Sequence, residues 1–368
     1  MTDDHLKLIK FISSDIFQST PMKILLGSIF AIHVIVDLIT VYYMLSTFDA
    51  KLFINYSSVF LGDFYPLLAI FVLLYKSKVI HNLKNELELW STDSTSKKLQ
   101  SKINLNIKFL KMFVIFNSLL FIVVGVTFVQ PLSKDYDVFF AYRLIHEYFP
   151  NYGHIFEFLY RTTYLLTSYI ATVLPFQIFY YCQHTNFQLQ MSIEQLKNLT
   201  KWSEDDENLV DNTKYQTEIN RRLKICIQRS QNFIRLHSEK IKEISKFIAG
   251  FALCACLLGI GVIFYLISGN FTPEYYLRMG ATSVAGITTF AATMWAGQST
   301  ESAIDDMVTS LNEVEWYNFN QSNKKLYLIF LTNSMKTRTI KFTENYSFNY
   351  QLGLGIVKGI YSVISILL

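Results

Sequence analysis

Seven stretches of the chain are almost continuously apolar and long enough to cross a lipid bilayer, which takes about 20 helical residues. They lie at 24–47, 54–75, 107–130, 154–181, 243–268, 274–298 and 343–367. The polar segments between them are too short to form a separate soluble domain. The pattern predicts an all-α polytopic membrane protein with seven transmembrane helices.

The last apolar stretch also carries a polar stripe. Its members recur at steps of three and four: Glu344, Ser347, Gln351, Gly355, Lys358, Ser362 and Ser365. Residues at this spacing share one helix face. Lipid cannot satisfy a lysine, a glutamine and two serines, so the stripe must meet water or protein. Two interpretations stay open: a helix–helix seam, where small residues allow close approach, and the wall of an aqueous pore.

The distribution of positive charge orients the chain. Of 368 residues, 51% are hydrophobic and only 17% charged, against about a quarter charged in soluble domains. Lys and Arg gather before the first span and in every second loop after it, whereas the alternate loops hold only Lys51, Lys134 and Arg143, with Arg278 at the outer start of the sixth span. Positive charge stays in the cytoplasm. We therefore expect a cytoplasmic N-terminus and an extracellular C-terminus, which is opposite to a G-protein-coupled receptor.

The segments placed in the cytoplasm are amphipathic. Apolar residues recur at helical spacing through 217–248, which predicts that the fifth span continues as a helix below the membrane. Residues 302–331 are expected to form one long helix before the last span. Together these helices predict an intracellular anchor bundle suited to assembling subunits. Near the N-terminus we expect a short interfacial helix with Leu6, Ile9 and Phe17 toward lipid.

Motifs for enzymatic or metal chemistry are missing from the sequence. It has no HExxH motif, no glycine-rich phosphate loop and no Cys/His cluster. None of the four cysteines lies in a segment placed outside the cell, so a disulfide framework is not expected. We expect neither an enzyme, nor a cofactor or metal site, nor a nucleic-acid partner.

The C-terminal third resembles the insect odorant receptors. That family typically has a Gly and a Glu-Ser pair after span six, a Trp-Tyr pair, basic residues, and a last helix ending near Tyr-Ser and Leu. Here these are Gly297, Glu301, Ser302, Trp316, Tyr317, Lys324, Lys325, Tyr361, Ser362, Leu367 and Leu368. The Thr-Tyr and Gln-Phe pairs usual in the last span of the related gustatory receptors are missing. The chain is also too short for the shared co-receptor, Orco, which has a longer cytoplasmic insertion.

The resemblance implies a subunit of a ligand-gated, non-selective cation channel. Four subunits would surround one pore in the plasma membrane of a sensory-neuron dendrite, and this tuning subunit would assemble with Orco. Residues 1–298 would hold six spans and a pocket in their outer half for a small apolar volatile odorant, 299–341 the cytoplasmic anchor, and 342–368 the pore helix. A gustatory receptor channel is the alternative, followed by a metabotropic seven-helix receptor or a transporter.

Candidate site residues follow from this assignment. In the pore, Ile366 matches the family's apolar gate, and Gln351, Lys358, Ser362 and Ser365 line the wall. Lys358 could instead snorkel to the headgroups. The candidate pocket residues are Tyr56, Phe60, Phe64, Phe121, Gly125, Phe128, Tyr160, Tyr164, Ser168, Tyr265 and Tyr276. For each of these the alternative is ordinary packing or an interfacial aromatic belt.

Several of the ionisable residues within the spans lie close to one another in sequence or at similar depth. His33 and Asp37 are one helical turn apart in span one, and Asp63 and Arg161 lie at similar outer depth in spans two and four. Charges at such depth are usually paired. We expect structural pairing here rather than contact with an odorant, since an apolar ligand has no use for a bare charge.

Overall fold

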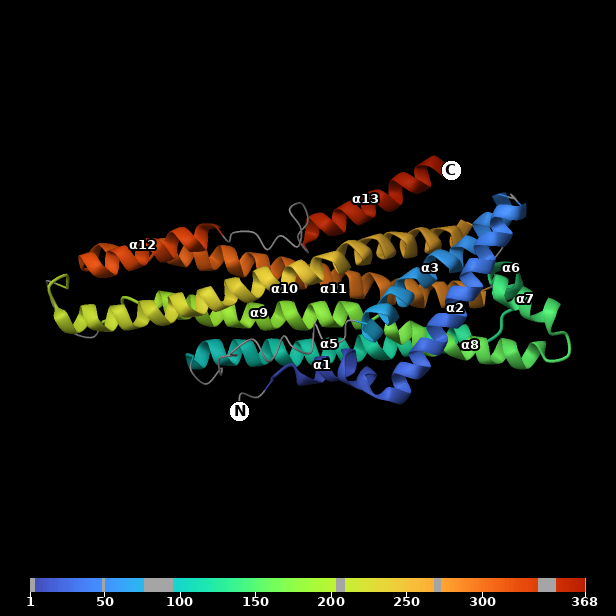
Figure 1. Ribbon diagram of the computed structural model, residues 1–368, viewed down its shortest axis with the longest axis horizontal. Coiled ribbons are helices and arrows are strands. Elements are labelled where there is room, and N and C mark those ends of the chain that lie inside the picture. The colour runs from blue at the N-terminus through green and yellow to red at the C-terminus, as the bar shows by residue number, and fades with distance from the viewer. Residues whose placement is uncertain are drawn as a thin grey trace.

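The computed structural model describes residues 4–47, 50–75, 95–202, 209–267, 273–336 and 349–367. Regular structure within these ranges is entirely helical, and the helices form one elongated bundle (Figure 1). Among the described residues, four helical stretches are long and apolar enough to cross a membrane: Thr20–Thr47, Leu52–Tyr75, Lys97–Val129 and Gly153–Lys197. A shorter apolar stretch spans Gly250–Phe264. The predicted all-α fold of apolar spans is confirmed.

The first spans correspond to α2 (Thr20–Thr47), α3 (Ala50–Tyr75) and α5 (Lys97–Val129). The fourth, expected as one helix over 154–181, is divided into α8 (Gly153–Ile170) and α9 (Val173–Lys197). Pro175 accounts for the division, because it has no N–H to donate to the carbonyl four residues earlier and its ring crowds that position.

Spans five and six belong to the two longest helices, α10 (Thr213–Ile267) and α11 (Pro273–Asn312). The predicted extension of span five is confirmed, since 217–248 lies inside α10. The expectation of one helix over 302–331 is wrong. α11 ends at Asn312, a short 3-10 turn η3 (Trp316–Asn318) follows, and α12 (Gln321–Lys336) runs back along the bundle (Figure 1).

Polar side chains fix this reversal. The Oδ1 atom of Asn320 accepts a hydrogen bond from the N–H of Asn323 (2.9 Å), which caps the start of α12. The side chain of Asn323 donates to the carbonyl of Gln216 on α10 (2.9 Å). Capping satisfies N–H groups that a helix start otherwise leaves unpaired. The chain can therefore turn here although its apolar pattern continues.

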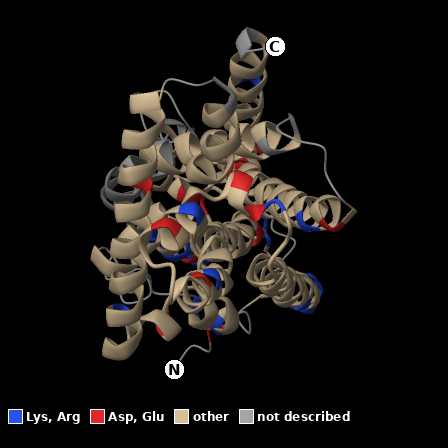
Figure 2. Ribbon diagram, turned by 90° about the vertical axis from the view of Figure 1, so that its right-hand side faces the viewer, with Lys and Arg blue, Asp and Glu red and all other residues tan. Residues whose placement is uncertain are grey.

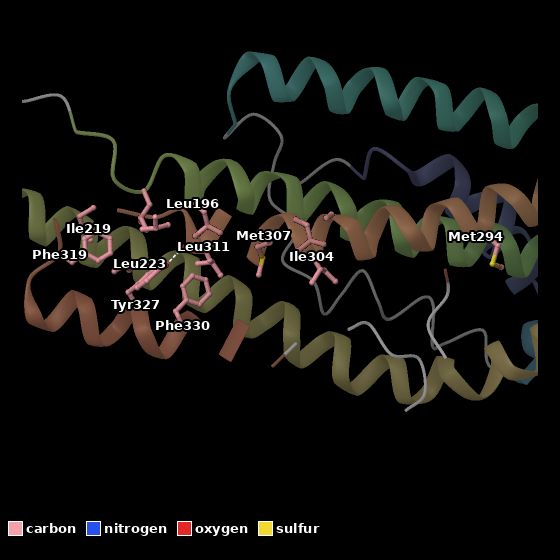
Figure 3. Close-up of a cluster of buried hydrophobic side chains, with 14 of the residues drawn as sticks. Leu196, Ile219, Leu223, Met294, Ile304, Met307, Leu311, Phe319, Tyr327 and Phe330 are labelled. Atoms are coloured by element: carbon pink, nitrogen blue, oxygen red, sulfur yellow. Dashed lines mark hydrogen bonds between the residues drawn. The ribbon is translucent and has the colours of Figure 1, made fainter. Parts of the chain in front are cut away.

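The ends of α9 and α11, the start of α10, and α12 form what we call the distal bundle. Its buried core includes Leu196, Leu223, Leu311 and Tyr327, one from each of these helices, and Phe319 from the turn before α12 (Figure 3). The Tyr327 hydroxyl donates to the carbonyl of Leu311. A helical bundle is therefore present where the sequence placed the anchor.

The N-terminal segment, α1 (Lys7–Ser13) and η1 (Asp15–Gln18), packs inside the protein. Leu6 and Ile9 are completely buried against α5 and α9, and Phe17 is buried beside α2 and α3. The expectation that these three face lipid is wrong. An amphipathic pattern shows that a helix has an apolar face but does not identify what covers it.

Three more helices complete the fold of the described residues. At the end opposite the distal bundle, α6 (Asp135–Val138) and α7 (Phe140–Tyr148) cover the tops of α2, α3 and α8 (Figure 1). The last helix, α13 (Tyr350–Leu367), packs against α10 and α11. The start of the predicted seventh span, with Glu344 and Ser347, lies outside the described residues.

Candidate functional site

A buried ionic cluster lies at the end of the bundle that carries α6 and α7. Asp135, fully buried, accepts hydrogen bonds from Nη1 of Arg161 (2.6 Å) and Nη1 of Arg278 (2.8 Å). Arg161 also pairs with Glu157 one turn earlier on α8 (2.6 Å). Figure 2 looks onto this end and shows acidic and basic positions side by side between the helices. Two arginines thus balance two carboxylates, which offsets the cost of removing them from water.

The same arginines lie over aromatic rings. The guanidinium of Arg161 is 4.0 Å from the ring centroid of Tyr142, and that of Arg278 is 5.0 Å from Phe128. Such cation–π contacts are stronger where water is excluded. They join the ionic cluster to the aromatic side chains below it.

We call Phe128, Phe139, Tyr142, Tyr160 and Tyr164 the aromatic cluster. Tyr164 lies at its centre, with ring centroids 5.7 Å from Phe128, 5.7 Å from Phe139 and 5.6 Å from Tyr160. These separations are typical of stacked and edge-to-face aromatic pairs. The rings come from α5, α7, α8 and the α6–α7 junction, so four segments meet here.

His33 of α2 adds a polar edge to the aromatic cluster. Its ring stacks on Tyr160 (5.0 Å) and contacts Tyr164 edge-on (5.4 Å). Nδ1 lies 3.3 Å from Oδ2 of Asp63, and Nε2 lies 2.9 Å from the hydroxyl of Thr163. The expected pairing is therefore present for three of the four residues: Asp63 pairs with His33, and Arg161 pairs with Asp135 and Glu157. For Asp37 it is not found, since its buried Oδ2 atom has no hydrogen-bond partner among the described residues.

Three predicted pocket residues, Phe128, Tyr160 and Tyr164, come together in the aromatic cluster. Tyr56 belongs instead to a neighbouring group with Phe140, where the centroids are 5.2 Å apart, and Phe60 packs beside that group. Of the remaining predicted residues, the structure places Phe121 against α11, Ser168 half-buried, Phe64 and Tyr276 exposed, and the side chain of Tyr265 outside the described residues.

Gly125 lies at the crossing of α5 and α8. A Cβ atom built there would be 2.8 Å from the Cα of Leu165. Because that neighbour is backbone, it cannot move aside as a side-chain end would. Gly125 therefore sets the approach of the two helices.

α13 presents two different faces. Gly353, Ile356, Gly359 and Ile360 point toward α10 and α11, where Gly353 faces Met294 and Gly359 faces Cys256. The predicted pore residues Gln351, Lys358, Ser362 and Ser365 are exposed on the single chain. The side chain of the predicted gate, Ile366, lies outside the described residues.

A profile described as 7tm Odorant receptor matches residues 49–361. The chain belongs to this odorant receptor family. The fold agrees with two solved structures of the insect olfactory receptor OR5 from Machilis hrabei. One, in complex with eugenol, has a TM-score of 0.66 at 8% identity and covers 99% of this chain and 100% of that chain. The other has a TM-score of 0.65 at 10% identity, covering 100% and 99%. No curated sequence is significantly similar to the chain.

Membership in the odorant receptor family makes this chain a multi-pass membrane protein that senses odorants. The sequence interpretation of its pocket missed several buried residues that pack with the aromatic cluster. Phe139 and Tyr142 come from the α6–α7 segment, and Tyr275 and Met279 from the start of α11. For Phe139 and Tyr142 the available signal was the cluster of aromatic residues that begins at Phe139, five residues after Lys134. A segment counted as outer loop thus supplies two of the five rings of the aromatic cluster.

Proposed function

We propose that this odorant receptor is the tuning subunit of a ligand-gated, non-selective cation channel whose pore is lined by α13. The exposed polar face of α13 carries the proposal. Lys358, Ser362 and Ser365 lie opposite the face that packs on α10 and α11. A lysine with serines at membrane depth needs water or a protein partner. Four copies of this face arranged around one axis would provide both the water of a pore and contacts with neighbouring subunits.

The odorant is proposed to bind at the aromatic cluster. A small apolar volatile gains affinity by burial, at about 25 cal/mol per Å² of apolar surface removed from water. Tyr160 and Tyr164 offer such surface, and His33 and Thr163 offer polar atoms that could orient a ligand. Support comes from the receptor of the same fold that was solved in complex with eugenol.

α11 connects the two proposed sites. Near its start it carries Arg278 and Met279 beside the aromatic cluster, and further along it Met294 contacts the α13 glycine Gly353. A ligand that displaces the start of α11 would also shift α13, because packed helices move as units. We propose this as the route from odorant binding to pore opening.

The proposed subunit has a cytoplasmic N-terminus, an extracellular C-terminus and a partner, Orco, in a heterotetramer of the dendritic plasma membrane. The Lys/Arg asymmetry supports the orientation. The distal bundle then lies in the cytoplasm and would be a surface for assembly. An epitope on the N-terminus should label only after cells are permeabilised, and labelling of intact cells would contradict the orientation.

The direct test is odorant-evoked current in cells expressing this chain with and without Orco. We expect prompt current only with Orco, and we expect it to persist when G-protein signalling is blocked. Slow current that is lost under the block would indicate a metabotropic receptor. Current without Orco, evoked by tastants rather than volatiles, would indicate a gustatory channel.

A further inference from the structure

Three potential metal ligands meet where α7 and α8 join. His146 comes from the end of α7, and His154 and Glu157 come from the first two turns of α8. One ligand atom from each lies within 4.8 Å of the others. Nε2 of His146 is already 2.8 Å from Oε2 of Glu157. None of the three residues belongs to the aromatic cluster or to α13.

The local structure explains why these side chains converge. His154 and Glu157 are three residues apart on a helix and so share a face. Gly153 makes room for the third ligand, because a Cβ atom there would lie 2.8 Å from Nδ1 of His146. The hydroxyl of Tyr136 lies 2.8 Å from Oε2 of Glu157 and 3.1 Å from Nε2 of His146. The Tyr136 hydroxyl oxygen is therefore placed to be a fourth ligand atom.

Two imidazoles and a carboxylate form a donor set that suits Zn²⁺, whereas Ca²⁺ and Mg²⁺ prefer six or more oxygens. Zinc–ligand bonds of about 2.0–2.1 Å in tetrahedral geometry separate two ligand atoms by about 3.3 Å. The His146–Glu157 pair would need to open by only about 0.5 Å. His154 is exposed, so its side chain can rotate inward without disturbing the core.

We propose that His146, His154 and Glu157 bind a zinc-class divalent ion at this corner. The fourth position is left to Tyr136 or water. Oε1 of Glu157 is held by Arg161 (2.7 Å), which in turn binds Asp135 and lies over Tyr142. Supporting partners of this kind orient a ligating carboxylate. An ion bound here would shift Glu157. Because Arg161 contacts both Glu157 and Tyr142, that one side chain connects the ion to the aromatic cluster.

Binding is tested on the purified full-length chain in detergent, carrying an affinity tag without histidine. Zn²⁺ is titrated against a zinc-sensitive indicator dye, and Co²⁺ serves as a probe because tetrahedral sites give it a visible absorption band. We expect one ion per chain. His154→Gln, a change at an exposed side chain, should weaken zinc binding by at least about tenfold, because losing even a residue that only supports a ligand costs roughly 10–100-fold. Gly153→Ala should also weaken it by displacing His146.

The matched control is His237→Gln, because His237 lies in α10, which supplies none of the three ligands. Zinc binding that His154→Gln leaves unchanged, or that His237→Gln removes, overturns the site. So does a wild-type chain that takes up Ca²⁺ as well as Zn²⁺.

A second measurement addresses the link to the aromatic cluster, and this step rests on the proposed channel function. Micromolar extracellular Zn²⁺ should shift the odorant dose–response of the wild type with Orco but not that of His154→Gln. Zinc that binds without shifting the response overturns the link and leaves the site intact. If no odorant current is obtained in zinc-free solution, the proposed channel function fails instead.

Discussion

Gly259 of α10 and Ile360 of α13 are in direct contact. A Cβ atom built on Gly259 would lie 2.5 Å from Cδ1 of Ile360. The glycine therefore lets α13 lie closer to α10 than any larger residue would. Because Ile360 belongs to the face opposite Lys358, this contact fixes the direction in which the polar stripe points.

Gly259→Leu should alter channel opening by moving α13 away from α10. Overpacking of a tight contact costs about 1–3 kcal/mol. We expect a several-fold change in the odorant concentration giving half-maximal current, or spontaneous current, and partial recovery in Gly259→Leu/Ile360→Ala. Gly280→Leu is the control, since a Cβ atom there meets nothing within 4 Å. Equal effects at both glycines would show that the Gly259–Ile360 contact does not control channel opening.

Asp135→Asn should strongly destabilise the chain. The asparagine keeps the shape of the carboxylate but leaves Arg161 and Arg278 without its charge in a buried site. Breaking a buried ion pair from one side costs about 3–5 kcal/mol. Thermal unfolding in detergent measures the loss. Glu218→Gln, in an exposed cluster with Arg221 and Arg222, should cost at most about 1 kcal/mol. Similar losses for both variants would contradict the structural role of Asp135.

The helical spans could be predicted from the sequence because the bilayer sets their length and composition. Where a helix ends, and what covers its apolar face, was harder to predict from the sequence. Residues 302–331 keep an apolar period through the turn at Asn320, and Leu6 and Ile9 show the same pattern whether lipid or α9 covers them. In both cases the deciding contact comes from another segment.

The same limit applies to the candidate site. Three aromatic residues of the cluster could be chosen because spans four and three place them at one depth. The partners of Arg161 and Arg278 could not, since Asp135 is 26 residues from the first and 143 from the second. Periodicity reports local structure, whereas buried ion pairs are set by which segments meet.

Asp4 should hold the N-terminal segment on α9 from neutral pH down to well below pH 4. Burial alone would raise its pKa, but hydrogen bonding and charge from His184, with hydrogen bonds from Tyr180 and the Leu6 amide, hold the pKa well below the ordinary aspartate value. A depressed folded pKa gives stability that is present above the unfolded pKa of about 3.9 and is lost only as pH falls through the folded value.

Limited proteolysis of the N-terminal segment measures this directly. Protection should be the same at pH 7 and pH 5, and Asp4→Asn should reduce it at both, since losing a charged hydrogen-bond acceptor costs about 1.5–3 kcal/mol. Asp137→Asn, on α6 at the other end of the bundle, is the control. Release of the segment between pH 7 and pH 5 would mean that another group holds it.

Tyr164 should determine which odorants the receptor accepts. Tyr164→Ala removes the ring that Phe128, Phe139 and Tyr160 contact, and should lower the potency of a well-fitting odorant by about 10–100-fold, for a loss of roughly 1–3 kcal/mol. Tyr164→Trp should favour smaller odorants. Tyr276→Ala is the control, because its side chain is 59% exposed. Unchanged dose–response curves for both Tyr164 variants would place the pocket elsewhere.

Lys358 should limit cation flow in proportion to the number of copies of this chain in the channel. If the exposed stripe of α13 lines the pore, four copies place four positive charges in one ring. Two unit charges about 8 Å apart repel by roughly 2 kcal/mol at an effective dielectric near 20. A ring of four has four adjacent pairs and also repels the permeating cation. A homotetramer should therefore conduct poorly, whereas a mixed channel with Orco, whose ring we expect to be less positive, should conduct well.

Two substitutions at Lys358 distinguish the pore wall from the snorkelling alternative. Lys358→Gln should raise cation conductance in the mixed channel or restore some in the homomer, because it removes the charge and keeps a polar side chain. Lys358→Glu should change the selectivity among cations. Tyr361→Phe is a matched control on the same helix, since Tyr361 is also exposed but lies off the polar stripe and the change leaves the charge of the ring unaltered. Single-channel recording measures both quantities. If wild type and both Lys358 variants conduct alike, the lysine reaches the headgroups and the stripe of α13 is a seam between subunits.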